Sequence, residues 1–353
     1  MVSTLDAAAM LAPLLQRGNA DAAAAIKVAS GRAGTWPETN FDFNRMRNLD
    51  ALVRLRTGRL ALADGIVLKD TALTVHAGGD AVEVRDLAGA ALGGAATAAI
   101  RIERSNDGGA MTGRIKIVKG QLGLFGAVGT GDLTLTLAGR GFGPAGLVSN
   151  LSGTGTLQLA GASVREVTPG TLQAAIETAL KASADTLSSA LRAAIATDAA
   201  RSTLSLGSPS IALKVQDGVM RLQPLTTATP EGQAVLKAAL DLAKFGVSGS
   251  WQVETRLPPL PGQIPASAAL VSAPPLPPVV QHFNVPLAAL DPARGERRTA
   301  VETDALEREL AVRKVERDLA ELERLRRVDE ERAAQREKEA KASSPNPGTA
   351  NNQ

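Results

Sequence analysis

The sequence predicts a mainly β protein whose strands follow one another in an antiparallel meander. Apolar and polar residues alternate along most of residues 48 to 256, and a period of two is typical of a sheet with one face in water. Pairs such as Asp217-Gly218 separate the alternating runs, and such pairs favour tight hairpin turns because these turns require positive φ. With 34 glycines and only 2% aromatic residues, the sheet is built mainly from Leu, Ile, Val, Ala and Thr.

Residues 1 to 45 are expected to form an N-terminal helical segment. Residues 4 to 29 are expected to form one or two short helices, with a break at Gly18-Asn19 and Asp21 as the N-cap of the second helix. Asp6 precedes the apolar run and no basic region comes before it, so the segment does not have the pattern of a secretory signal. No stretch of the sequence reaches the roughly 20 apolar residues of a membrane-spanning helix.

Two regions, 46 to 167 and 201 to 256, carry the strand pattern. A helical region, 168 to 200, lies between them and begins with Thr168 as N-cap and Pro169 as the first helical residue. Apolar residues keep helical spacing from there to about residue 198, and Ser183 marks a break. The sequence therefore predicts one sheet region interrupted by helices.

The C-terminal third changes character at residue 257. Residues 257 to 299 are rich in proline, which suits a linker or an edge segment and argues against central strands.

Residues 300 to 341 predict a charged amphipathic helix, with i,i+4 pairs expected for Asp304/Arg308, Glu309/Arg313 and Glu323/Arg327. The apolar stripe of this helix is narrow and is expected to bury little apolar surface. Deletion of residues 300 to 353 should therefore leave the β fold intact. Residues 342 to 353 are expected to be disordered. The apolar stripe consists of Leu306, Leu310, Val312, Val315, Leu319, Leu322, Leu325 and Val328, and it does not keep one heptad register for three repeats.

Charge and composition exclude several functions. The net charge is only +3 and no basic run is interleaved with aromatic residues, so we expect no nucleic-acid partner, while a mildly positive body is compatible with phospholipid headgroups. Cysteine is absent, and the two histidines, His76 and His282, have no accompanying catalytic or metal-binding motif. The sequence therefore predicts a protein that is not an enzyme and has no catalytic residues, metal site or cofactor.

The segment GRGFGPAG, residues 139 to 146, contains the spacing of a dinucleotide-binding loop at Gly141, Gly143 and Gly146. A strand that feeds such a loop is buried on both faces and continuously apolar, whereas Leu133 to Leu137 alternate with threonine. After Leu151 the alternation resumes at once, which leaves no room for a crossover helix. The pattern therefore argues against a nucleotide-binding loop, and the glycines need another explanation.

Three segments are similar to AsmA-like proteins of the bacterial envelope. They are LRTGRLALADGIVLKDTALTV (55 to 75), the glycine- and leucine-rich stretch 129 to 167, and PSIALKVQDGVMRLQPL (209 to 225). The charged segment 304 to 327 also resembles tails of this family. The resemblance implies a curled antiparallel sheet that forms an apolar trough, a role in outer-membrane assembly, and a position on the periplasmic side of the inner membrane. In such a sheet the segment GRGFGPAG would be the corner between a strand and a helix of one to two turns. The resemblance also implies an N-terminal membrane anchor, which this chain does not show and which we expect to be encoded upstream of Met1.

The resemblance further implies that phospholipid is the partner and that an apolar stripe on the sheet lines the trough. From the residue pattern alone, a facing sheet or helix could fill the same stripe, as in a sandwich. A second interpretation is a structural or adhesive envelope scaffold whose charged C-terminal helix oligomerises or docks on a partner. The candidates for the lipid groove are Ile115, Ile117, Leu133, Leu135, Leu137, Leu157 and Leu159.

Overall fold

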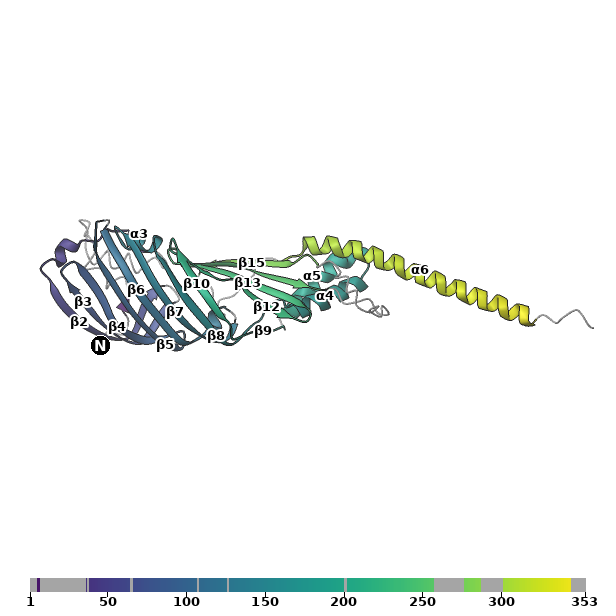
Figure 1. Ribbon diagram of the computed structural model, residues 1–353, viewed down its shortest axis with the longest axis horizontal. Helices are drawn as coiled ribbons and strands as arrows, with labels where there is room; N and C mark the ends of the chain where they lie inside the picture. Colours follow the sequence, from purple (N-terminus) through teal and green to yellow (C-terminus); the bar gives the residue numbers. More distant parts are fainter. Residues whose placement is uncertain are drawn as a thin grey trace, which may run out of the picture.

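A computed structural model shows an elongated molecule in which one sheet forms the body and a long helix extends from one end (Figure 1). The strands next to β2 stand side by side across the long axis, whereas β13 and β15 run more nearly along it (Figure 1). The structure describes residues 5–6, 36, 38–63, 66–106, 108–125, 127–199, 202–256, 276–286 and 301–343.

The expected meander is confirmed, because almost every strand pairs with its neighbours in the sequence and all pairs but one are antiparallel. β9 pairs with β8, and β12 with β13, beside the main path. The strands are β1 (Leu5–Asp6), β2 (Asp50–Ala63), β3 (Ile66–Gly78), β4 (Ala81–Ala91), β5 (Gly94–Ser105), β6 (Gly108–Gln121), β7 (Ala127–Gly141), β8 (Ser152–Val164), β9 (Leu204–Gly207), β10 (Ser210–Gln216), β11 (Val219–Leu222), β12 (Leu225–Thr229), β13 (Gly232–Asp241), β14 (Gly246–Thr255), β15 (Val279–Pro286) and β16 (Val301–Glu302).

Bulges bend the sheet at several strands. Asp70, Asp86 and Lys119 have φ between 48° and 55° and lie where the register of β3, β4 and β6 shifts against a neighbouring strand. Gly129 in β7 has φ of 119° at a further shift. A bulge bends its strand and increases the local twist, so the repeated bulges account for the curl of the sheet. The Asp217-Gly218 pair also has positive φ at both residues, as expected for its hairpin turn.

The helical segment expected near residues 168 to 198 is confirmed. It consists of α4 (Pro169–Lys181), the 3-10 turn η4 (Ala184–Thr186) and α5 (Leu187–Ala199). Thr168 is the N-cap of α4 and forms a capping box with Thr171, whose backbone N–H donates to the Thr168 hydroxyl at 3.1 Å. Two further short helical elements are η2 (Phe43–Met46) and η3 (Leu122–Phe125).

Helix α4 packs on β13 and β14 at one end of the sheet, and α5 packs against α4. Trp251 of β14 is buried there, and its indole N–H donates to the carbonyl of Val167 at 2.8 Å. This contact joins the start of α4 to the sheet. The fully buried residues Leu172 and Leu191 lie in the same core cluster.

The C-terminal helix α6 (Asp304–Ser343) begins in this core cluster and then leaves the body (Figure 1). Leu306 and Leu310 are 0% exposed, so the expectation that the helix buries little is wrong for its first two turns. Arg192 of α5 donates to Glu307 at 2.7 Å and lies 3.4 Å from Asp304. Burial alone raises the pKa of the Glu307 carboxyl, but hydrogen bonds from Arg192, Thr303 and Ser188 and the charge of Arg192 together hold that pKa below its usual value.

The i,i+4 pairs expected on α6 are realised in part. Arg313 donates to Glu309 at 2.8 Å, as expected. Asp304 pairs with Arg192 instead of Arg308, because the base of α6 lies against α5. Among the described residues, Glu323 and Arg327 form no ion pair.

Two further expectations change with the structure. Leu5–Asp6 forms a short strand parallel to β2 at Leu60 and Ala61, where the sequence predicted a helix. The remainder of the predicted helical stretch, residues 7 to 35, lies outside the described residues. The proline-rich region contains a true strand, β15, that pairs with β14 over eight residues. Its prolines are compatible with pairing because Pro286 is the last residue of the strand and no proline lies inside it.

Candidate functional site

One face of the sheet carries all seven residues of the predicted lipid groove. Ile117 of β6 lies opposite Leu133 of β7, which lies opposite Leu157 of β8, and Ile115 lies opposite Leu135. Leu137 and Leu159 point to the same face, because residues two apart along a strand share a face. The structure therefore brings the seven side chains together.

The apolar rows continue into strands that the groove prediction did not include. The row of Leu133 runs on through Ala96 in β5 and Ile211 in β10. The row of Leu135 continues to Leu213, and that of Leu137 to Val215. Alternation in these strands was visible in the sequence, but the pairing of β8 with β10 across the helical region could not be read from it. We call this continuous surface the apolar face.

The apolar face is covered at both ends and less covered between them. Helix α3 (Pro144–Ser149) and the segment around Phe41 and Phe43 pack near Leu135 and Leu137, which are buried. At the other end Leu159 is buried and packs with Leu122 among others. The four remaining groove residues are only half-buried, and they are Ile115, Ile117, Leu133 and Leu157.

Glycines on the apolar face let neighbouring strands and side chains approach closely. A Cβ on Gly155 would lie 2.3 Å from the carbonyl oxygen of Thr134 and 2.9 Å from Leu135 Cδ1. A Cβ on Gly153 would lie 2.1 Å from the oxygen of Thr136 and 3.1 Å from Leu137 Cδ2. The glycines thus make room for the buried leucines beside them.

The segment GRGFGPAG forms the corner between β7 and α3 and holds two close backbone contacts. A Cβ on Gly141 would lie 2.3 Å from the backbone nitrogen of Leu147, and one on Gly143 would lie 2.3 Å from the oxygen of Thr39. Gly146 has room, since the nearest atom to its Cβ would be 3.9 Å away. With six residues, α3 is one to two turns long, so these glycines serve packing at a strand-to-helix corner.

Gly141 has no room for a Cβ and Gly146 does, so alanine substitutions at these two positions form a matched pair of variants. We expect Gly141→Ala to lower the free energy of unfolding by about 1 to 3 kcal/mol, because the new methyl group meets fixed backbone. Gly146→Ala should be neutral or stabilising by up to about 1 kcal/mol, because alanine favours a helix. Urea unfolding of both variants measures this, and equal losses would contradict the packing explanation.

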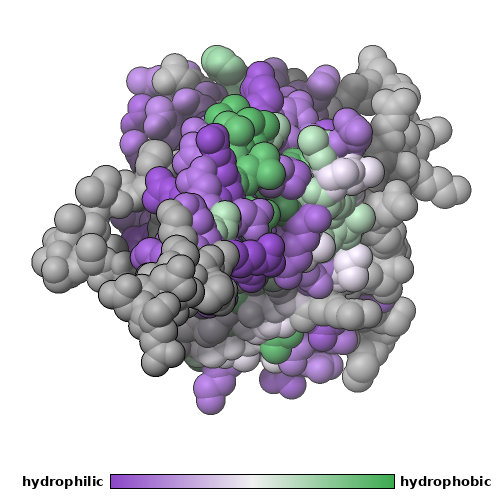
Figure 2. All heavy atoms as spheres, turned by 90° about the vertical axis from the view of Figure 1, so that its right-hand side faces the viewer, coloured by the Kyte–Doolittle hydropathy of each residue, from purple (hydrophilic) through white to green (hydrophobic). Residues whose placement is uncertain are grey.

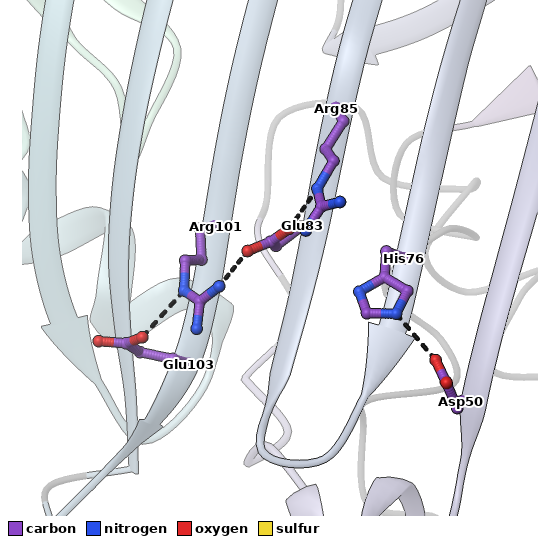
Figure 3. Close-up of polar contacts among 6 residues, drawn as sticks. All are labelled: Asp50, His76, Glu83, Arg85, Arg101 and Glu103. Carbon is purple, nitrogen blue, oxygen red and sulfur yellow. Dashed lines mark hydrogen bonds and ion pairs between the residues drawn. The ribbon is translucent and has the colours of Figure 1, made fainter.

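The opposite face is polar and carries an ionic chain across β4 and β5 (Figure 3). Glu83 pairs with both Arg85 and Arg101, and Arg101 also donates to Glu103 at 2.9 Å. Hydrogen bonding from Arg85, opposed by partial burial and assisted by Arg101, holds the pKa of Glu83 below its usual value. The two arginines and Glu103 are exposed, although Glu83 is not. Ion pairs at a surface contribute little each, and we interpret these four residues as part of a solvated outer surface.

The two histidines lie in ordinary surface pairs. His76 Nε2 is 2.8 Å from Asp50 Oδ1 on this outer face (Figure 3), and His282 Nε2 is 3.8 Å from Glu302. Within the described ranges, no group of three or more His, Asp or Glu residues is arranged to hold a metal ion. In the same part of the chain, no helix is both long and apolar enough to cross a membrane.

Fold and site together define a β protein with one open, curled antiparallel sheet and a continuous apolar face. Comparison of the chain with protein-family models, curated proteins and solved structures gives no match.

Proposed function

We propose that this chain is an AsmA-like envelope protein that binds or conducts phospholipid along its apolar face. In this proposal it acts on the periplasmic side of the inner membrane and contributes to outer-membrane biogenesis. The protein binds lipid without catalysing a reaction, and needs neither metal nor cofactor.

The observation that carries the proposal is the half-buried row of Ile117, Leu133 and Leu157 on three adjacent strands. Ile117 and Leu157 each pack partly against a cluster of buried residues, and Leu133 lies between them in the register. Each acyl methylene that such a surface removes from water contributes about 0.8 kcal/mol. A chain of several methylenes laid along the row would therefore bind with a substantial hydrophobic free energy.

The residue types on this face support acyl chains over ligands that need hydrogen bonds. Leucine, isoleucine, valine, alanine and glycine make up its rows, whereas small-molecule sites usually add a few placed polar groups. Polar residues occupy the opposite positions, such as Thr134 and Thr136 on β7. The sheet thus offers one surface to lipid and the other to water.

The test is the phospholipid content of the full chain after purification without detergent. We expect solvent extraction and mass spectrometry to recover phospholipid in a defined ratio to protein. A folded protein that carries no lipid, and takes up none from phospholipid vesicles, would support the scaffold alternative.

A further inference from the structure

The outer part of α6 carries an apolar stripe that no described residue covers. Val312, Val315 and Leu319 are each 57% exposed and Leu322 is 63% exposed. Seen from the end of the molecule that carries α6, apolar side chains gather among hydrophilic ones (Figure 2). The helix projects away from the sheet here (Figure 1), so a partner could reach the stripe without disturbing the fold.

The stripe has the spacing of a short coiled-coil seam. Residues 312, 315, 319 and 322 follow the 3-4-3 spacing of a and d positions over two heptads. Fourteen helical residues span about 20 Å. This length suits a reversible contact with one helix.

Carboxylates flank the stripe, and arginines lie away from it. Glu316 and Glu323 occupy the e positions and Asp318 a g position, while Arg317 and Arg324 occupy f positions on the far side. Asp318 is already paired with Lys314 at 3.3 Å. Neither Glu316 nor Glu323 forms an ion pair within the part of the chain that the structure describes.

These charges disfavour a second copy of the same helix. In a parallel pair, g and e positions of the two helices meet, which places Asp318 beside the partner's Glu323. In an antiparallel pair that overlays the two stripes, Glu316 meets the partner's Glu323. Both arrangements bring like charges together beside the seam, and like-charge contacts disfavour a pairing.

We propose that the segment 312 to 325 of α6 docks an amphipathic helix whose apolar stripe is flanked by lysine or arginine. Basic residues at the partner's e and g positions pair with Glu316 and Glu323, while its apolar residues cover Leu319 and Leu322. An anionic membrane surface is disfavoured by the same carboxylates, since helices that lie on membranes carry basic residues on their polar face. This inference does not depend on lipid binding by the sheet.

The experiment uses the full chain and two synthetic 28-residue helices with leucine at a and d positions. One peptide has lysine at every e and g position, and the other has glutamate there. We expect the chain to bind the lysine peptide at least about tenfold more tightly than the glutamate peptide, with the preference shrinking as NaCl screens the charges. Isothermal titration calorimetry measures both affinities.

Two double variants test whether the preference for the lysine peptide depends on this surface of α6. Glu316→Lys/Glu323→Lys should reverse it, and Leu319→Ser/Leu322→Ser should abolish binding of both peptides. All four side chains are exposed, so circular dichroism should report an unchanged fold. Equal affinities for the two peptides, an unreversed preference in the lysine variant, or a chain that forms dimers dissolved by Leu319→Ser/Leu322→Ser would overturn the proposal.

Discussion

Replacing Leu135 by aspartate is expected to unfold the protein or to lower its free energy of unfolding by more than about 3 kcal/mol. Leu135 is 6% exposed and belongs to the cluster that contains Leu137 and Leu147. Loss of a buried leucine costs about 2 to 5 kcal/mol, and an unsatisfied buried polar group adds about 1 to 3 kcal/mol. The variant should therefore show a large drop in its thermal midpoint.

Thr136→Asp is the matched control for this variant. Thr136 lies on the opposite face, is exposed and stands opposite Arg114 in the register. Its replacement should change the free energy of unfolding by no more than about 0.5 kcal/mol. A Leu135→Asp protein as stable as Thr136→Asp would show that the covered end of the apolar face is open to water.

Truncation within the C-terminal helix should have an effect that depends sharply on where the chain is cut. Deletion of residues 300 to 353 removes the fully buried Leu306 and Leu310 and uncovers the cluster around Leu191. We expect the free energy of unfolding to fall by roughly 4 kcal/mol or more, since each buried leucine contributes at least about 2 kcal/mol. Deletion of residues 319 to 353 removes only the projecting part of α6 and should leave the thermal midpoint nearly unchanged.

Circular dichroism melts of the two truncated proteins measure this difference. Equal stability of both would mean that the base of α6 is not part of the core. The sequence interpretation expected that result, because the stripe of the whole helix is narrow. It did not foresee that the first two turns meet the surface of α4 and α5.

The fold was largely predictable because its signals are local. Alternation and glycine pairs mark the meander, and Thr168-Pro169 marks the start of α4. The curl depends on bulges at residues such as Asp70 and Lys119. No turn motif in the sequence marks the positions of these bulges. The pairing of β8 with β10 joins residues on both sides of a helical region, and such contacts depend on tertiary packing.

The sequence predicts which face of the sheet carries the candidate site, but not how deeply each of its residues is buried. A period of two places Leu133, Leu135 and Leu137 on one face. It cannot show that Leu137 lies beneath α3, or that Leu133 stays half-buried. Exposure along the groove depends on what covers each end, and the covering segments are distant in the sequence.

Phospholipid retention by Leu133→Glu and Thr134→Glu tests the central claim most directly. Leu133 is half-buried on the apolar face, and Thr134 is exposed on the other face next to it, so both proteins should fold. A carboxylate at position 133 should displace about two methylenes of an acyl chain, a loss of about 1.6 kcal/mol or more, and so retain about tenfold less lipid. Thr134→Glu should match the unmodified protein in extracted phospholipid. Equal lipid content in the two folded variants would contradict lipid binding on this face.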